Sequence, residues 1–389
     1  MPRTRSASIV ERRSAASDSL SIPLARAARR VGAQGRAALS LVRVSGAAAR
    51  GNGTSRVWAA RRARQVRRHG GFEYQEALTT GLIDPALSPE DCATYVSRHV
   101  NMEAQLRLNG SDEPDILNQK IVFQRYCEGV GVRVPRLVGV VDRLGGSWML
   151  PDGGVLPIEA GGVDLLPSSF IVKPSAGYEG FGVQLLHRTE GGGLAQHDGR
   201  PTTLPELVFE LRSHPDFDTW LVQERIRNHP DVVAIAGGET VHTIRFITLV
   251  GRDGRAELLW VGMRLGIGDA AVDNFRGGTL GNLSCSVDPE TGVVFDACRI
   301  RDDGLGLTPS PTIPGTSIQV DGVRLPHWDE AREMVLRASP EFLPVRTIGW
   351  DIALSPDGPV ALEANTRWGA PGIPGMRAVV ARLEDALPR

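Results

Sequence analysis

The sequence predicts an α+β protein in which a helical N-terminal region precedes runs of strands. Apolar residues recur every three or four positions up to residue 130, which is the spacing of helices that pack on a core. From Val134 onward, short apolar runs bounded by Gly and Pro indicate strands. These strands follow one another with only occasional helices between them, so a regular parallel βαβ array is not expected.

Length and composition are those of a soluble globular protein with two or three packed subdomains. The chain has 389 residues, of which 41% are hydrophobic and 23% are charged. No apolar run reaches the ~18 residues that a membrane-spanning helix needs. The four cysteines, at 92, 127, 285 and 298, show no C-x-x-C spacing, which argues against a disulfide framework and a zinc site. Reduced thiols of this kind indicate a cytoplasmic protein.

Residues 1–70 differ in charge from the rest of the chain. They hold 16 arginines and two acidic residues, a net charge of +14, whereas the remainder carries −15. We expect a basic Arg- and Ala-rich arm that is partly helical or disordered, with amphipathic helices near Leu24–Val44 and Val57–Arg68. A solvated arm, a helix docked on the body, contact with an acidic surface and contact with nucleic acid all fit this composition. No nucleic-acid contact is expected from the body.

The rest of the chain divides into a helical region at 71–133 and two strand-rich regions at 134–226 and 227–389. The expected helices are Glu73–Leu78, Pro89–Leu108, Asn118–Glu128, Leu204–Arg212 after a cap at Thr202 or Thr203, and Pro326–Ala338. The expected strands are Leu137–Val141, Phe170–Lys173, Gly182–Leu186, Trp220–Ile226, Thr243–Val250, Ala256–Leu265, Val293–Cys298, Ser317–Val320, Thr347–Leu354 and Pro359–Asn365.

The only two lysines, Lys120 and Lys173, indicate a phosphate-binding site. Arginine supplies the other 42 of the 44 basic side chains, so we expect lysine where a compact, flexible point charge is needed. Lys173 ends a short apolar strand and precedes a Gly-rich loop, an order typical of nucleotide-phosphate sites. Asp115 or Asn118 would cap the helix that carries Lys120. The alternative is a codon bias that left two arbitrary surface lysines.

The last two strands form a hairpin that brings oxygen ligands together. If a three-residue loop pairs Ser355 with Pro359, Asp351 lies opposite Glu363, and Asn365 points to the same face. Facing carboxylates repel unless a cation lies between them, and hard oxygen ligands suit Mg²⁺. A two-residue loop would shift this register by one. A surface hairpin with solvated acidic residues is the alternative.

A third segment, the strand that ends in Gln223 and Glu224, is a weaker signal. Its backbone groups and the Glu224 carboxylate could meet the edge and the amino group of an adenine. Asp231 could then bind a ribose hydroxyl. An ordinary sheet strand, and a turn residue after Pro230, are equally compatible with these residues.

In this order, the motifs resemble the ATP-grasp superfamily, and more narrowly its sugar-transfer-associated group, which is related to α-L-glutamate ligases. The resemblance covers residues 72–375. The narrower match is carried by the segments 241–248, 273–278, 288–292, 325–328, 349–353 and 358–365. The chain departs from the family pattern at His242, where Asn is usual, and at 366–369, where the side chains are larger than in many relatives.

The resemblance implies two α+β subdomains that clasp ATP between antiparallel sheets: a lid with the Gly-rich loop at 134–226 and a C-terminal subdomain with the metal site at 227–389. The implied nucleotide-binding residues are Lys120, Lys173, Ser175, Gly177, Gly180, Gly182, Gln223, Glu224, Ile226 and Asp231. The implied ligands of one or two Mg²⁺, for which Mn²⁺ is a possible substitute, are Asp351, Glu363 and Asn365. The implied catalytic residues, which would hold the γ-phosphate and an acyl phosphate, are Arg245, Arg264 and Arg367. A role for His242 or His327 stays open.

The activity that the resemblance implies is that of an ATP-dependent carboxylate–amine ligase. Its co-substrates would be a small-molecule or peptide carboxylate and an amine, in the biosynthesis of a polysaccharide, a peptide or another secondary product. Two alternatives are compatible with the same residues. The protein could be a kinase that stops at phosphorylation, or a non-catalytic nucleotide-binding protein tethered by its basic arm.

Overall fold

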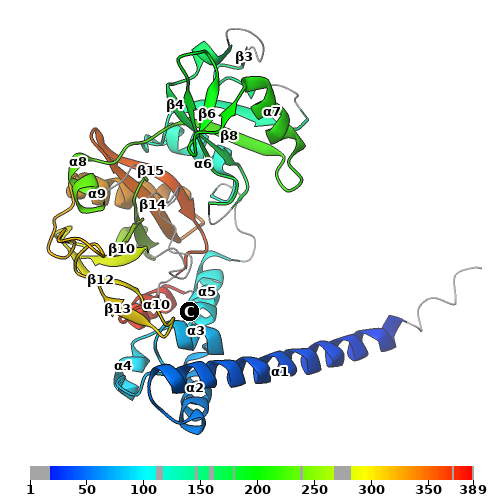
Figure 1. The fold of residues 1–389 in the computed structure, drawn as a ribbon, viewed down its shortest axis with the longest axis vertical. Coiled ribbons are helices and arrows are strands. Elements are labelled where there is room, and N and C mark those ends of the chain that lie inside the picture. Colours follow the sequence, from blue (N-terminus) through cyan, green and yellow to red (C-terminus); the bar gives the residue numbers. More distant parts are fainter. Residues whose placement is uncertain are drawn as a thin grey trace, which may run out of the picture.

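The computed structural model describes residues 18–110, 117–144, 148–156, 162–177, 180–236, 240–266, 282–369 and 372–387, with side chains from residue 35 onward. They form three parts that follow one another along the long axis in Figure 1. A helical part is followed by a part built on a seven-stranded sheet and by a part built on an eight-stranded sheet. Among the described helices, none is both long and apolar enough to cross a membrane.

The helical part is a small domain with its own core. Its helices are α1 (Asp18–Gly51), α2 (Arg56–Gly70), α3 (Tyr74–Thr79), α4 (Pro89–Ala93) and α5 (Arg98–Asn109). Ser55 starts α2 by accepting a hydrogen bond from the backbone of Trp58, and Gly71 ends it with φ at 71°. Val44 shares one buried cluster with Phe72, so the predicted arm boundary at residue 70 crosses a packed core. The residues from 35 to 70 are therefore helices docked on the body.

The eight-stranded sheet, in the region predicted to be a lid, is shown in green at the top of Figure 1. Its strands are β1 (Leu137–Asp142), β2 (Trp148–Met149), β3 (Val155–Leu156), β4 (Ser169–Pro174), β5 (Gln184–Arg188), β6 (Leu194–Gln196), β7 (Pro201–Thr202) and β8 (Thr219–Glu224), in the antiparallel order β3-β2-β1-β8-β4-β5-β6-β7. The short helix η1 (Gly162–Leu165) precedes β4. Helix α7 (Leu204–Ser213) covers one face, and Thr203 caps it in a capping box with Glu206.

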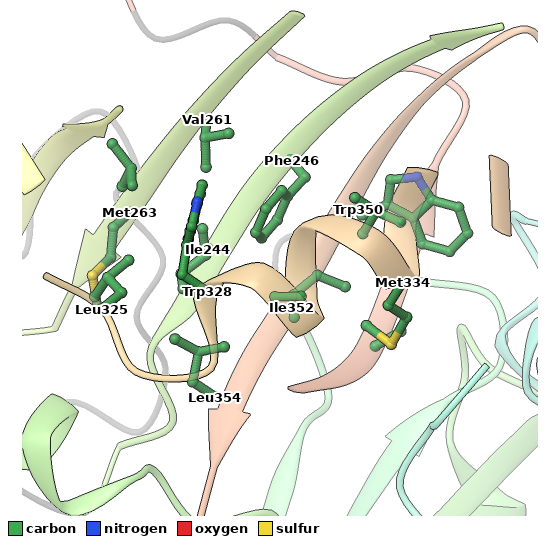
Figure 2. Packing of buried hydrophobic residues seen from close by; sticks show 14 of the residues in the cluster. Ile244, Phe246, Val261, Met263, Leu325, Trp328, Met334, Trp350, Ile352 and Leu354 are labelled. Carbon is green, nitrogen blue, oxygen red and sulfur yellow. The ribbon is translucent and has the colours of Figure 1, made fainter. Parts of the chain in front are cut away.

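The seven-stranded sheet carries the largest core. Its strands are β9 (Thr243–Val250), β10 (Ala256–Leu265), β11 (Leu283–Val287), β12 (Val294–Ile300), β13 (Leu307–Pro309), β14 (Thr347–Ser355) and β15 (Gly358–Asn365), in the order β13-β12-β11-β10-β9-β14-β15. Helices α8 (Pro230–Ala236), α9 (Trp328–Ala338) and η3 (Ser339–Phe342) pack on one face, and α5 and α10 (Met376–Asp385) pack on the other. Figure 2 shows Phe246 of β9 beside Trp328 of α9, with ring centroids 5.3 Å apart.

Helix α6 (Lys120–Gly129) joins the two sheets. The ring of Phe123 lies 6.3 Å from that of Trp350 in the core of the seven-stranded sheet. Ile121, on another side of α6, packs against Leu137 and Leu221 of the eight-stranded sheet. The first turn of α6, which carries Lys120, therefore lies where the two subdomains meet.

The predicted order of helices and strands is confirmed, with three local corrections. The strand predicted at Ser317–Val320 is wrong, because only an isolated bridge between Thr312 and Gln319 forms there. The helix predicted over Pro89–Leu108 is two helices, since the chain leaves the helix before Ser97 caps α5. Gln119, not Asn118, precedes α6 and makes no side-chain cap, and Asp115 lies outside the described residues. Helices α8 and α10, the short helices η1 and η3, and the short strands β2, β3, β6, β7, β11 and β13 were not predicted.

Candidate functional site

A cavity of about 2300 Å³ lies between the two sheets. Drug-sized ligand sites usually enclose about 300–1,000 Å³, so this cavity has room for more than one ligand. It is lined by both sheets, by the start of α6 and by residues of α2, α3 and α5. The predicted site residues that line it are Lys120, Lys173, Gly177, Gly180, Gln223, Glu224, Ile226, Arg245, Arg264, Asp351, Glu363, Asn365 and Arg367.

Lys173 enters the cavity from the end of β4. Its Nζ atom donates to the backbone oxygen of Leu362 on the opposite sheet at 3.3 Å. The pKa of Lys173 is lowered to about 8, mainly by burial; the charge of Glu363 opposes this shift and that of Lys120 adds to it. The charged form of this lysine is therefore unfavourable in the folded protein unless an anion binds beside it.

Lys120 approaches the same place from the first turn of α6. Its Nζ atom donates to the Gly177 carbonyl at 2.5 Å and lies 3.6 Å from Oε2 of Glu363. Its backbone N–H donates to the Ser175 carbonyl at 2.9 Å, which ties α6 to the end of β4. The two lysines that composition singled out therefore approach the same segment, residues 173–177, which leads into the Gly-rich loop. Lys173 is its first residue, and Lys120 contacts its last residue, Gly177.

Glycine is required in that loop at two positions. Gly180 and Gly182 have φ at 73° and 74°, in the left-handed region that side chains disfavour. A Cβ atom on Gly182 would also lie 2.9 Å from Pro174. Gly177 has no positive φ, so its predicted conformational role is not needed there, and its carbonyl instead receives Lys120. Residues 178–179 lie outside the described part of the loop.

The hairpin pairs Asp351 with Glu363 as predicted, but by a different route. The loop has two residues, not three, because Ser355 pairs with Gly358. This shorter loop shifts the register by one up to Ile352, and an extra residue at Leu362 shifts it back. The carbonyl of this bulge residue is the one that accepts from Lys173.

Asp351 is held by two arginines. Arg245 donates to both of its oxygens, at 2.7 and 2.9 Å, and Arg264 donates to Oδ1 at 3.0 Å. Asn365 donates to Oδ2 at 3.4 Å. Burial alone would raise the pKa of Asp351, but the charges of Arg245 and Arg264 outweigh it and hold the pKa below its usual range. Asp351 is thus an ionised, buried carboxylate.

The oxygen donors fit a metal site only in part. A carboxylate offers about four lone-pair positions, and four N–H groups already point at Asp351. Glu363 and Asn365 are half-buried at the cavity wall, where their oxygens suit Mg²⁺. No group of three His, Cys, Asp or Glu residues with metal-binding geometry occurs in the described part of the chain. Of the three predicted ligands, Glu363 and Asn365 therefore suit a metal ion better than Asp351 does.

Gln223 and Glu224, which were predicted to form an adenine hinge, both bind other protein groups. The backbone N–H of Arg136 donates to Glu224 at 2.9 Å, and the Arg136 side chain lies 3.5 Å from the same carboxylate. Gln223 is buried and donates to Gln124 on α6. Both side chains thus have protein partners, and both residues line the cavity together with Ile226.

Three predicted binding residues do not line the cavity. Ser175 is buried and donates to Gln119 at 3.1 Å, so it holds β4 against α6. Gly182 shapes the loop from behind, and Asp231 lies in the first turn of α8 beside His229. The two histidines also lie outside the cavity lining. His242 accepts from the backbone of Gly266 at 3.2 Å, and His327 precedes α9 with φ at 51°.

Sequence reasoning missed a row of buried amides on α5. Gln105 accepts from the backbone N–H of Trp368 and donates to its carbonyl, both at 2.9 Å, and Asn101 donates to the same carbonyl. Asn109 donates to the carbonyls of Thr347 and Thr366 at 3.0 and 3.2 Å. The i, i+4, i+8 spacing of these amides was the available signal. They hold the segment that follows Asn365.

The charges at the centre of the cavity favour an anionic ligand. Four cationic side chains and two carboxylates meet there, which leaves an excess of two positive charges: Lys120, Lys173, Arg245 and Arg264 against Asp351 and Glu363. Arg245 uses Nε and Nη2 on Asp351, and its Nη1 group has no partner among the described residues while the side chain lines the cavity. A polyphosphate matches this excess of charge.

Comparison with known families identifies most of the chain. The model of the family described as sugar-transfer-associated ATP-grasp matches residues 99–386. A comparison with curated proteins finds no significant match. The match thus includes α5, both sheets and α10.

Solved structures with a similar arrangement share little sequence with this chain. D-alanine–D-alanine ligase from Helicobacter pylori is 13% identical, with 70% of this chain and 62% of that chain covered and a TM-score of 0.39. A RimK-domain ATP-grasp protein from Sphaerobacter thermophilus is 12% identical (70% and 68% covered, TM-score 0.35). N5-carboxyaminoimidazole synthetase from Staphylococcus aureus, complexed with ADP, is 10% identical (65% and 45% covered, TM-score 0.34). The chain thus spans less than two thirds of the Helicobacter ligase.

Proposed function

Because this chain belongs to the sugar-transfer-associated ATP-grasp family, we propose that it is an ATP-dependent ligase that joins a carboxylate to an amine through an acyl phosphate. One arrangement carries the proposal: lysines and metal-binding oxygens face each other across one cavity. Lys120 lies 3.6 Å from Glu363, and Lys173 donates to the backbone carbonyl of Leu362, the residue before Glu363. All of these groups line the same cavity, where a magnesium-bound triphosphate would contact both the lysines and the oxygens. The proposed compartment is the cytoplasm, where the four free cysteines would stay reduced.

The proposed reaction has two steps. An oxygen of the substrate carboxylate attacks the γ-phosphorus of ATP, and the bond from that phosphorus to the bridging oxygen breaks to release ADP. The nitrogen of a neutral amine then attacks the acyl carbon, the carbon–oxygen bond to phosphate breaks, and the surplus proton of the amine passes to solvent. The products are an amide, ADP and phosphate. Positioning and charge neutralisation are the protein's main contributions to such a reaction.

Each group has a place in this scheme. Lys120 and Lys173 would hold the α- and β-phosphates, and the remaining donors of Arg245 would hold the γ-phosphate. Glu363 and Asn365 would hold Mg²⁺, or Mn²⁺ in its place, which when bound neutralises phosphate charge as a Lewis acid. The Gly180–Gly182 turn would exclude water that hydrolyses an acyl phosphate.

Substitution of Glu363 by Gln tests the proposal. Removing the anionic ligand should lower ADP formation by about a thousandfold, a few kcal/mol of lost charge stabilisation, while the protein stays folded. ADP release is measured over pools of carboxylic acids with and without amines. Glu384→Gln, at an exposed site on α10, is the matched control and should be fully active. Normal turnover of Glu363→Gln at ordinary Mg²⁺ would contradict the metal assignment.

The products separate the ligase from a kinase. A ligase releases phosphate and forms an amide only when both the acid and the amine are present. An acyl phosphate formed without the amine would be trapped by hydroxylamine as a hydroxamate. A stable phosphorylated product that reacts with neither the amine nor hydroxylamine would show that the protein is a kinase instead.

A further inference from the structure

We propose that the outward side of α1 is a docking surface for an anionic lipid membrane. This α1 surface consists of Arg36, Leu39, Val42, Arg43 and Arg50. At 100° per residue the five side chains fall within a sector of about 120° around the helix. Leu39 and Val42 are 62% and 68% exposed, and the three arginines are exposed as well. The other side of the helix, with Leu41, Val44 and Ala48, is buried against α2 and α3.

The charge of this region has a single sign. Between residues 19 and 72 the sequence contains 12 arginines and no Asp or Glu. Within the described part of the chain, the three arginines of the α1 surface form no ion pair, whereas Arg67 nearby on α2 pairs with Glu73 at 2.8 Å. Each arginine of the surface is thus available to an anionic partner.

The mixture of side chains favours a membrane over other anionic partners. Aliphatic side chains flanked by arginines suit the headgroup boundary of a bilayer, where the first insert and the second meet lipid phosphates. A nucleic acid offers phosphates but little for Leu39 and Val42 to contact. A second copy of the chain would bring arginines against arginines. Figure 1 shows the N-terminal part of α1 projecting away from the rest of the molecule, while its C-terminal part lies against α2 and α3.

The surface is separate from the proposed ligase site. None of its five residues is among those that line the cavity. Docking should therefore leave ATP turnover intact, and its test is independent of the proposed function. If both hold, the enzyme would act beside a lipid surface.

Vesicle co-sedimentation of the full-length protein tests the proposal. We expect binding to vesicles of phosphatidylcholine mixed with phosphatidylglycerol, little binding to phosphatidylcholine alone, and a loss of binding as salt screens the charges. Arg36→Gln, Arg43→Gln and Arg50→Gln together should weaken binding by roughly 100-fold, at about fivefold for each arginine. Leu39→Ser with Val42→Ser should weaken it roughly tenfold at constant salt.

Phe209→Ser provides the matched control, because Phe209 is 73% exposed on α7 of the lid, far along the chain from α1. This variant should bind vesicles like the unchanged protein, and all variants should keep their melting temperature. Equal binding to neutral vesicles would overturn the proposal, and so would full vesicle binding by the variant with Leu39→Ser and Val42→Ser. It would also be overturned if duplex DNA displaced the vesicles and bound this variant as tightly as it binds the unchanged protein. A dimer detected by light scattering would also overturn it if the three arginine substitutions made that dimer more stable, because this would indicate self-association through α1.

Discussion

Lys173 is a side chain whose placement favours ligand binding over stability. It is half-buried at the cavity wall, and burial, which outweighs the opposing charge of Glu363, lowers its pKa to about 8 from an ordinary value of 10.5. The shift means that the folded protein without ligand holds the charged form unfavourably. An anionic ligand would relieve that cost, so part of its binding energy would come from removing the unfavourable burial of the Lys173 charge.

Lys173→Met should therefore stabilise the ligand-free protein while abolishing ATP binding. Below pH 8 the lysine is charged in both states, and its burial costs about 1–3 kcal/mol, allowing for partial access of water. Above that pH the folded state loses the proton while the unfolded state keeps it until 10.5, so the stability of the unchanged protein rises. Chemical denaturation from pH 7 to 10.5 should show the gap between the two proteins closing. A gap that is constant with pH would refute this account.

Asp351, unlike Lys173, is a buried charge that the protein itself compensates. Four N–H groups hold it, so its charge is well compensated inside the protein. The residue types and the pairing with Glu363 could be predicted from the sequence. Its arginine partners could not, because Arg245 and Arg264 lie on two other strands, and only the register of β9 and β10 places them there.

Helix α5 connects the helical part to the site. Its buried amides bind the backbone on either side of the hairpin strands that carry Asp351 and Glu363, at Thr347 and at Thr366 to Trp368. Strand β15, which carries the proposed metal ligands, is thus held at its end by a helix from outside both sheets. Apolar spacing predicted a helix here, and the register of its amides against a loop some 260 residues away could not be seen in a single sequence.

Gln105→Ala should disturb this connection. The change leaves the buried N–H of Trp368 without a partner, and should destabilise the protein by about 1–3 kcal/mol. It should also raise the Mg²⁺ concentration needed for half-maximal ADP release, because the chain after Asn365 is no longer held. Gln65→Ala, at an exposed site on α2, is the control. Loss of stability with unchanged Mg²⁺ dependence would restrict α5 to a purely structural role.

At the scale of the whole molecule, the site exists only because two sheets face each other. The eight-stranded sheet contributes Lys173, the seven-stranded sheet contributes Glu363 and Asn365, and α6 brings Lys120 to the junction. A nucleotide bound by all of them would tie the two subdomains together. Binding should then appear as a gain in the stability of the entire body.

A non-hydrolysable ATP analogue with Mg²⁺ should therefore raise the melting temperature. At a hundredfold excess over its dissociation constant, the stabilisation should be about 2.7 kcal/mol. The gain should vanish on chelation of the metal, and both Lys173→Met and Glu363→Gln should lose most of it. Full stabilisation of either variant would mean that the nucleotide binds to one sheet alone.

The sequence by itself determined the α+β class, the family resemblance, both lysines and the acidic hairpin, because these depend on residue type and on neighbours within about ten positions. Tertiary structure decided which of those residues meet. Ser175 and Asp231 lie outside the cavity lining, and Asp351 pairs with arginines from two other strands. A bulge at Leu362 restored a register that the real loop length would have shifted. Such outcomes depend on contacts between distant segments, and the spacing within one segment does not encode them.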